Sequence, residues 1–285
     1  MPVSDVILRP CPVCGDTELS CEYSADPEIF AKGNHTYDIR VLDQLNPELK
    51  QALTIGQCAN CDMIYSTAQL SDGVIEKVYD ELIDWHKSLA KVRPDTIGLA
   101  EQRVIGAVQA VFGDNGPGDA RILDFGCGWG QCLTALHDLG ATNILGCEMS
   151  KPRLAHLKEK AIPAKSCLKE VQTKGPFELI IMHHSLEHLY DVKTTLSTVC
   201  SLLAPKGRLY VSVPDARQMF ESTKGTCLRP SQTASKDVNP WEHVNYFTQD
   251  TLIRILNDAG MIVETLLGTP PGIVEGIIAK SSPAR

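Results

Sequence analysis

The residues best suited to hold a small ligand lie in the segment 121–140, which reads RILDFGCGWGQCLTALHDLG. An apolar, strand-like run reaches Asp124, and three glycines then alternate with other residues: Gly126, Gly128 and Gly130. Glycines at such a turn let the backbone approach a ligand closely. The apolar residues that follow recur at helical spacing, and the free N–H groups at the start of a helix can bind a ligand. The pattern therefore predicts a ligand site at a turn between a strand and a helix.

An acidic residue follows the next apolar run of the sequence. The run 144–147 is followed by Glu148, which lies 20 positions after Gly128. At the end of a second strand, an acidic side chain can accept hydrogen bonds from both ribose hydroxyls of a nucleoside. Gln131 stands where the dinucleotide pattern G-x-G-x-x-G has its third glycine. The spacing thus favours a nucleoside ligand other than the dinucleotide cofactor of a dehydrogenase. The alternatives are that dinucleotide cofactor, or a glycine turn that binds no ligand.

The two stretches DFGCGWG and GCEMS resemble the cofactor site of class I S-adenosylmethionine-dependent methyltransferases. The resemblance implies an α/β, Rossmann-like fold with a mostly parallel seven-stranded sheet and S-adenosylmethionine as the cofactor. It also implies a set of cofactor-binding residues: Asp124, Gly126, Cys127, Gly128, Gly130, Glu148, Met149 and His183.

Two pairs of cysteines, each with two intervening residues, have the spacing of zinc ligands: Cys11, Cys14, Cys58 and Cys61. Each pair can turn two thiolates toward one tetrahedral Zn²⁺. Four cysteine ligands close a site to substrate, so we expect a zinc ion that stabilises the fold and does no chemistry. Cys21 and His35 lie between the pairs and are alternative ligands.

A run of histidines follows the apolar segment 178–182, which we expect to be the third strand. A helical turn would place His184 and His188 on one face with Glu187, the H-x-x-E-H pattern of a class of zinc peptidases. The nucleotide-type elements around the run argue against a peptidase. Some quinone-ring O-methyltransferases of similar fold hold a divalent ion here with carboxylates and a histidine, and this chain has His184 in place of one carboxylate.

A second polar cluster, WEHVNYF at 241–247, precedes a helix-like run with Thr248 as its cap. It resembles a stretch in zinc-ribbon-bearing methyltransferases that act on nucleotide-linked sugars. The resemblance implies that three residues flank the acceptor as catalytic groups: His188, Glu242 and His243. We expect His243 to be the general base, because it lies beside Glu242 in a loop that could close over substrate. The alternative for each histidine is a structural role, with its ring bonded to the backbone.

The run CANCDMIYSTAQLSDGVIEKVYDEL resembles the segment that joins the zinc ribbon to the methyltransferase domain in the same group. We therefore expect a zinc-binding, zinc-ribbon-like domain over residues 1–70 and a methyltransferase domain over 71–285. A helix should begin after Ser71 or Asp72. The expected substrate-binding residues are Tyr79, His184 and Tyr246, and core packing is the alternative for Tyr79.

Strands and helices should alternate in the second domain, as in a parallel sheet covered on both faces. A helix is expected over 101–112, and the expected strands are 121–125, 144–148, 178–182, 208–213, 261–267 and 273–279. The polar segment 221–240, rich in Gly, Ser, Thr and Pro, predicts a lid or a flexible loop.

Composition narrows the class of partner. The chain of 285 residues has a net charge of −8 and a pI of about 5.5, which argues against sequence-independent binding to nucleic acid or acidic membranes. No apolar run approaches the roughly 18 residues of a membrane span, and the N-terminus has no signal-peptide core. We therefore expect a cytoplasmic protein, in which 11 cysteines serve as metal ligands, core residues or free thiols.

Together, the resemblances imply a methyltransferase, and we expect it to modify a small acceptor, a hydroxyl of a sugar or of another biosynthetic intermediate. The sugar C-methyltransferases of this type carry a further C-terminal domain that a chain of 285 residues lacks, so we expect methylation of oxygen, with nitrogen as the alternative acceptor atom. Two alternatives remain: a zinc-ribbon RNA base methyltransferase, and a module that binds the cofactor without turnover.

Overall fold

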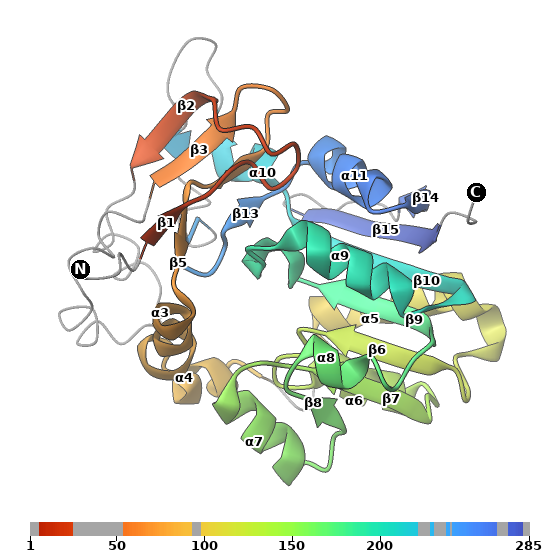
Figure 1. The fold of residues 1–285 in the computed structure, drawn as a ribbon. Coiled ribbons are helices and arrows are strands. Elements are labelled where there is room, and N and C mark those ends of the chain that lie inside the picture. The colour runs from red at the N-terminus through yellow and green to blue at the C-terminus, as the bar shows by residue number, and fades with distance from the viewer. Residues whose placement is uncertain are drawn as a thin grey trace.

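The computed structural model describes residues 6–24, 54–92, 98–221, 229–230, 238–239, 241–266 and 273–281. A large sheet flanked by helices forms one part of the molecule, and smaller sheets near the N-terminus form the other (Figure 1). His35 and most of the expected lid at 221–240 lie outside the described residues.

The large sheet contains seven strands in the order β14-β15-β10-β9-β6-β7-β8. Five of them pair in parallel, from β10 to β8, while β15 runs antiparallel to β10 and β14 antiparallel to β15. The expected α/β, Rossmann-like and mostly parallel sheet is therefore confirmed. Its strands are β6 (Arg121–Phe125), β7 (Asn143–Cys147), β8 (Ala164–Lys165), β9 (Phe177–His183), β10 (Leu203–Pro214), β14 (Met261–Leu266) and β15 (Ile273–Ser281).

Two strands differ from the sequence prediction in instructive ways. Strand β10 begins at Leu203, whereas the prediction starts it at 208. Leu203 already pairs with β9, and the regular pairing resumes only at Arg208, after an irregularity. Gly207 lies within this irregularity, where an added Cβ would be 2.6 Å from the carbonyl oxygen of Phe177. Strand β8 has only two residues, too few to give an alternating pattern.

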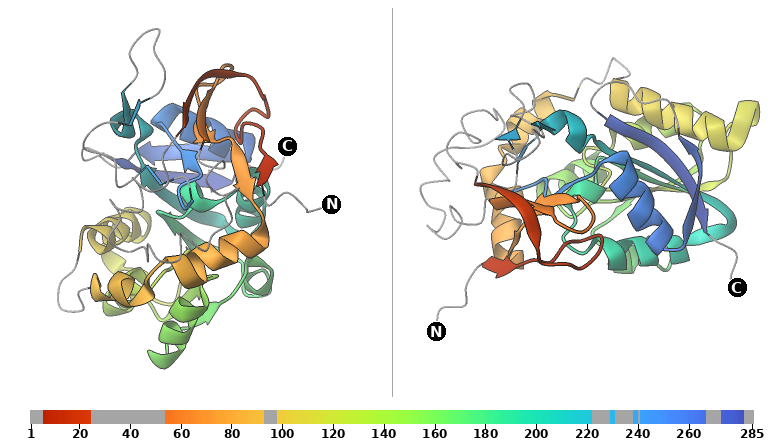
Figure 2. Two further views of the ribbon diagram at one scale, coloured as in Figure 1. Left: turned by 90° about the vertical axis from the view of Figure 1, so that its left-hand side faces the viewer. Right: turned by 90° about the horizontal axis from the view of Figure 1, so that it is seen from above.

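The helices cover both faces of this sheet (Figure 2). Neighbouring strand residues point to opposite faces, so Ile122 packs with α5 (Leu99–Phe112), α6 (Gln131–Asp138) and α7 (Lys151–Glu159). Leu123 packs on the other face with α9 (Val192–Ser201) and α11 (Gln249–Asp258). The expected helix at 101–112 is thus confirmed as α5, with Val104, Ala107 and Val108 buried.

The N-terminal part contains a four-stranded antiparallel sheet in the order β13-β4-β3-β2. Its strands are β2 (Leu19–Ser24), β3 (Thr54–Cys58), β4 (Ile64–Ser66) and β13 (Asn245–Tyr246), and a separate pair joins β1 (Val6–Leu8) to β5 (Ala68–Leu70). Strand β13 comes from the segment of the second candidate catalytic cluster. The N-terminal sheet is therefore completed by a strand from the far end of the chain, although the boundary at residue 70 stays a prediction.

Short helices connect the two parts (Figure 1). The helix expected after Ser71 is α3 (Asp72–Lys77), with Ser71 at its N-cap, and it continues as the π-helix η2 (Val78–Leu82) before α4 (Trp85–Ala90). Val74, Val78 and Leu82 are its buried residues and lie in one apolar cluster. Among the described helices, none is both long and apolar enough to cross a membrane.

Candidate functional site

Glu148 lies at the carboxyl end of β7, and its carboxylate is held by the backbone of two turns. Its Oε2 accepts a hydrogen bond from the Gly128 N–H at 2.9 Å, and its Oε1 accepts one from the Ser150 N–H at 2.8 Å. Nη1 of Arg153 lies 3.6 Å from Oε2. A carboxylate has about four lone-pair positions, so two remain to accept hydrogen bonds from a pair of hydroxyls.

The three glycines of the turn have positive φ angles of 80°, 56° and 83°, a backbone conformation that strains any residue with a side chain. An added Cβ at Gly126 would lie 2.7 Å from Cβ of Ser185, and one at Gly130 would lie 2.6 Å from Cδ2 of Leu157. At Gly128 it would meet no described atom within 4 Å. Packing therefore requires Gly126 and Gly130, whereas Gly128 faces open space beside Glu148.

Other expected cofactor residues surround this turn. Asp124 is buried, and its burial, together with the charge of Glu148, raises the pKa of the carboxyl to about 7. The Cys127 N–H donates to the Cys147 carbonyl, and burial raises the pKa of the Cys127 thiol, which keeps it protonated. Met149 is 58% exposed directly after Glu148. An apolar side chain in this position can pack against the base of a nucleoside.

Two buried polar atoms lie unpaired where β9 ends. Nδ1 of His183 and Oγ of Ser185 have no hydrogen-bond partner within the described residues. Burial, with a smaller effect of His184, lowers the pKa of His183 to about 3, so the ring is neutral. Because buried polar atoms are normally hydrogen-bonded, this end of the sheet offers bonding capacity to a ligand.

His188 has the best-defined hydrogen bonds of the candidate catalytic residues. It ends the short helix η4 (Leu186–His188), and its Nδ1 lies 2.8 Å from the carbonyl oxygen of Glu242 and 3.3 Å from Oη of Tyr79. A carbonyl only accepts, so we assign the proton to Nδ1, which leaves the lone pair of Nε2 available. Burial lowers the pKa of His188, against the opposing charge of Glu187. The imidazole is therefore neutral near pH 7 and can accept a proton.

His243 lies next to His188, with ring centroids 4.8 Å apart. The carboxylate of Glu242 is turned to Asn239, whose Nδ2 donates to Oε1 at 2.8 Å. Glu242 thus contacts His188 through its carbonyl oxygen, and its carboxylate has a separate partner. The three expected catalytic residues are brought together by the fold.

Glu187 is the buried charge of this cluster, with 1% of the residue exposed. Its Oε1 lies 3.3 Å from Nδ1 of His184 and 4.0 Å from Nε2 of His188. Burial alone would raise its pKa, but the neighbouring imidazoles lower the pKa of Glu187 to about 2. Glu187, His188 and His243 also place ligand atoms within 4.8 Å of one another, so these three residues could hold a metal ion.

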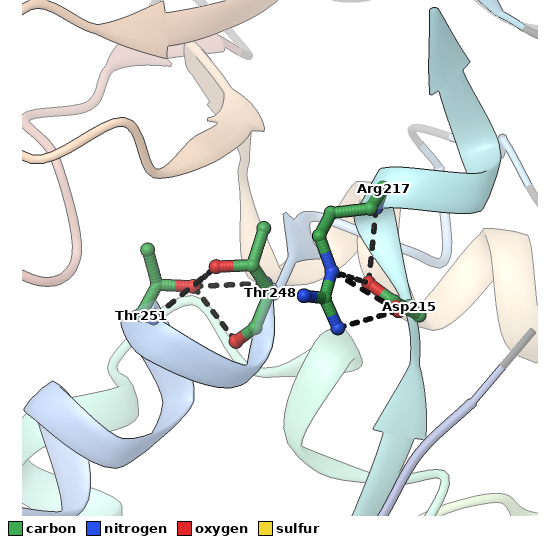
Figure 3. A network of polar contacts seen from close by, with 4 residues as sticks. All are labelled: Asp215, Arg217, Thr248 and Thr251. Atoms are coloured by element: carbon green, nitrogen blue, oxygen red, sulfur yellow. Dashed lines mark hydrogen bonds and ion pairs between the residues drawn. The ribbon is translucent and has the colours of Figure 1, made fainter. Parts of the chain in front are cut away.

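The two clusters meet because the connection after β10 returns to the carboxyl end of the sheet. The Ala216 N–H donates to the Phe247 carbonyl at 2.9 Å, which joins the two ends of that connection. Figure 3 shows the polar contacts that fix each end, an ion pair and a capping box formed by Asp215, Arg217, Thr248 and Thr251. Residues 241–247 are thereby placed beside η4.

The expected substrate-binding residues occupy different environments. The hydroxyl of Tyr79 reaches His188 from η2, and His184 is one-third exposed with a positive φ of 51°. Tyr246 is only 1% exposed and packs edge-on against Phe220, so the structure gives it a core-packing position. Substrate contact by all three stays a prediction.

The four paired cysteines converge on one point. Sγ of Cys11 lies 3.5 Å from Sγ of Cys61, and Sγ of Cys14 lies 3.4 Å from Sγ of Cys58. All four sulfur atoms are within 4.8 Å of one another. Four thiolates around a tetrahedral Zn²⁺ would be about 3.8 Å apart, as follows from Zn–S bonds of roughly 2.3 Å. The arrangement fits that ion with only small adjustments.

Glu187 was identified from the sequence through the H-x-x-E-H pattern, but two other residues of the site were missed. Ser185 had no local signal, since its place depends on the close packing against Gly126. Trp129, whose Nε1 donates to Oγ of Ser88 at 3.1 Å, joins α4 to the glycine turn, and no local pattern indicates that contact.

Comparison with known families adds an independent observation. A family described as a methyltransferase domain matches residues 98–266. The chain is 29% identical over 163 residues to the mitochondrial ubiquinone biosynthesis O-methyltransferase of Homo sapiens, covering 52% of this chain and 43% of that one. It is 26% identical over 142 residues to the trans-aconitate 2-methyltransferase of Variovorax paradoxus, covering 48% and 52%. The match thus spans about half the length of each relative.

Solved structures share the fold at low sequence identity. The 1,6-didemethyltoxoflavin-N1-methyltransferase of Burkholderia thailandensis aligns with a TM-score of 0.55 and 17% identity, covering 79% of this chain and 98% of that one. The magnesium protoporphyrin IX methyltransferase of Synechocystis, with bound S-adenosylhomocysteine, gives a TM-score of 0.53 and 16% identity, covering 73% and 99%.

Proposed function

The chain belongs to the methyltransferase-domain family, and from this premise we propose that it transfers a methyl group from S-adenosylmethionine to a hydroxyl oxygen of a small biosynthetic acceptor. The observation that carries the proposal is the 2.8 Å contact between Nδ1 of His188 and the carbonyl oxygen of Glu242. It joins two polar clusters from distant parts of the sequence near the end of β9, and it leaves one neutral imidazole nitrogen able to accept a proton.

The residues at the carboxyl end of the sheet fit the cofactor. Glu148 would accept the two ribose hydroxyls, and the open space at Gly128 would admit the ligand close to the backbone. Met149 would pack against the adenine ring of the cofactor. The unpaired atoms of His183 and Ser185 could form hydrogen bonds with polar groups of the cofactor. When bound, S-adenosylmethionine supplies an electrophilic methyl group.

The protein's own groups then have two tasks, to position the acceptor and to keep a lone pair on its oxygen. Nε2 of His188 can take the hydroxyl proton as the oxygen attacks, because Nδ1 already donates to the Glu242 carbonyl. Glu187, buried and ionised, stabilises the imidazolium that forms. This geometry favours His188 over His243 as the base, since the neighbouring Glu242 carboxylate is bonded to Asn239. His243 would then contact the acceptor.

The relatives support the choice of a small acceptor. Their names refer to ubiquinone biosynthesis and to trans-aconitate, so an acceptor of this size is part of the proposal. A sugar hydroxyl rests on the sequence resemblance alone. A cytoplasmic location and the exclusion of nucleic acid partners rest on composition and charge.

We further propose that Cys11, Cys14, Cys58 and Cys61 bind a structural Zn²⁺. Its four positions would be filled by thiolates, so the ion would hold the N-terminal turns together without contacting substrate.

Transfer of a tritiated methyl group from S-adenosylmethionine tests the proposal, with small-molecule extract and total RNA as separate acceptors. We expect label in the small-molecule fraction. His188→Ala should lower the rate by about 10²- to 10⁴-fold while S-adenosylhomocysteine affinity stays within a few-fold. His137→Ala, at a surface histidine that is 76% exposed, is the matched control. Label in RNA alone, or cofactor binding without any transfer, would contradict the proposal.

A further inference from the structure

Arg9 is a buried cation of the N-terminal part, with 8% of the residue exposed. It lies two residues before the first cysteine, and its backbone N–H donates to the Thr67 carbonyl. Its guanidinium donates hydrogen bonds to segments that lie about 180 and 235 residues later in the chain. The function proposed above gives Arg9 no role.

The guanidinium bonds to both segments that carry the candidate catalytic histidines. Nη1 donates to the Val244 carbonyl at 2.9 Å and Nη2 to Oδ1 of Asn245 at 2.6 Å, directly after His243. Nη2 also donates to the Tyr190 carbonyl at 3.0 Å, two residues after His188. One side chain thus fixes the backbone that follows each imidazole.

Further hydrogen bonds make these contacts a closed network. Nδ2 of Asn245 donates to the Leu189 carbonyl at 2.7 Å, and the Val244 N–H donates to the Glu187 carbonyl at 2.9 Å. Asn245 therefore accepts from Arg9 and donates to the segment after His188. A shift of either segment would break bonds in the other.

The chemistry of this contact requires arginine. Its five acceptors are all neutral carbonyl or amide oxygens, so the buried charge is stabilised by hydrogen bonds and by the ring of Tyr190, 5.2 Å away. A guanidinium stays protonated in proteins, so this side chain carries its charge at neutral pH. A planar guanidinium can donate in several fixed directions at once, which a lysine ammonium on a flexible stem cannot reproduce.

We propose that Arg9 is a positioning residue that holds His188 and His243 in their productive arrangement. The inference depends on the proposed function for its effect on rate, but not for its effect on the histidines themselves. Loss of Arg9 should leave the fold intact and displace the two imidazoles. Because a misplacement of about 1 Å can reduce turnover by about 100-fold, the rate of methyl transfer should then fall.

The test follows the imidazole signals of His188 and His243 by nitrogen NMR in Arg9→Met and Arg9→Lys, assigned with His188→Gln and His243→Gln. Arg208→Met is the matched control, because Arg208 bonds the Gly207 carbonyl and Glu264 at the sheet edge. We expect both imidazole signals to move in the two Arg9 variants and neither in the control. Zinc content and S-adenosylhomocysteine affinity should stay within about 3-fold, while methyl transfer falls by about 10- to 100-fold.

Unchanged imidazole signals in a folded Arg9→Met would overturn the inference. If that variant does not fold, the same result in Arg9→Lys would overturn it. Displaced signals, with transfer that is insensitive to His188→Ala and His243→Ala, would refute the proposed base and leave the positioning role of Arg9 supported. Loss of zinc or of cofactor affinity in parallel with the signals would assign Arg9 a general structural role and contradict the inference.

Discussion

Replacing Gly128 by alanine tests the ligand site against a control that the chain itself provides. Gly128 has φ 56° and Gly118 has φ 51°, and at both positions an added Cβ meets no described atom within 4 Å. Each alanine must adopt a left-handed conformation, which costs about 1–2 kcal/mol of stability. The two variants should therefore lose similar amounts of thermal stability.

Only one of them should lose cofactor affinity. The Gly128 N–H bonds to Glu148, so a methyl group at Gly128 enters the space we assign to the ligand. Forcing a methyl group into a packed contact costs about 1–3 kcal/mol, which corresponds to about 5- to 150-fold in affinity. Calorimetric titration with S-adenosylhomocysteine measures this. Equal affinity of Gly128→Ala and Gly118→Ala would refute the placement of the ligand, and Gly128→Val should abolish binding.

Three further results are expected. Glu148→Ala should weaken S-adenosylhomocysteine binding by about 10- to 150-fold. Glu178→Ala is the control and should not weaken it, because Glu178 also accepts a backbone N–H and pairs with an arginine but lies outside the proposed site. Equal losses of affinity in the two variants would count against the ribose contact. Cys14→Ser should lower the zinc content from about one ion per chain and loosen the N-terminal part, and full zinc retention in metal analysis would exclude this ligand. His183 has a pKa of about 3 in the folded protein and about 6.5 unfolded, so the unfolded chain binds more protons and stability should fall as pH decreases below about 6.5. In His183→Gln, the decrease in unfolding free energy between pH 7 and 5, measured by denaturant unfolding, should be smaller. An unchanged dependence of the unfolding free energy on pH would contradict a neutral buried ring at His183.

Local sequence patterns were sufficient for the central elements of the fold. The strand at 121–125 is observed with the expected bounds, and the helix after Thr248 begins with that residue as its cap, because apolar period and capping chemistry are local properties. Strand β8 and the early start of β10 were missed, since two-residue pairing and an interrupted ladder depend on neighbouring strands.

The candidate site shows the same division. Glu148 and the glycine turn could be identified from spacing, because both lie in one continuous unit of strand, turn and helix. Our preference for His188 over His243 as the proposed base could not be reached from spacing, because it depends on which partner the Glu242 carboxylate takes. Arg9 gave no signal at all, because its partners are separated from it by up to 236 positions.

The most direct test of the central claim is to identify the atom that receives the methyl group. The purified protein would be incubated with S-adenosylmethionine labelled with carbon-13 in the methyl group and with small-molecule extract, and the product methyl would be identified by carbon-13 NMR. We predict a methyl carbon bonded to a former hydroxyl oxygen, with the chemical shift of a methoxy group, present with wild-type protein and reduced by about 10²- to 10⁴-fold with His188→Ala. A methyl group bonded to nitrogen or carbon, or a yield that His188→Ala does not change, would contradict the account.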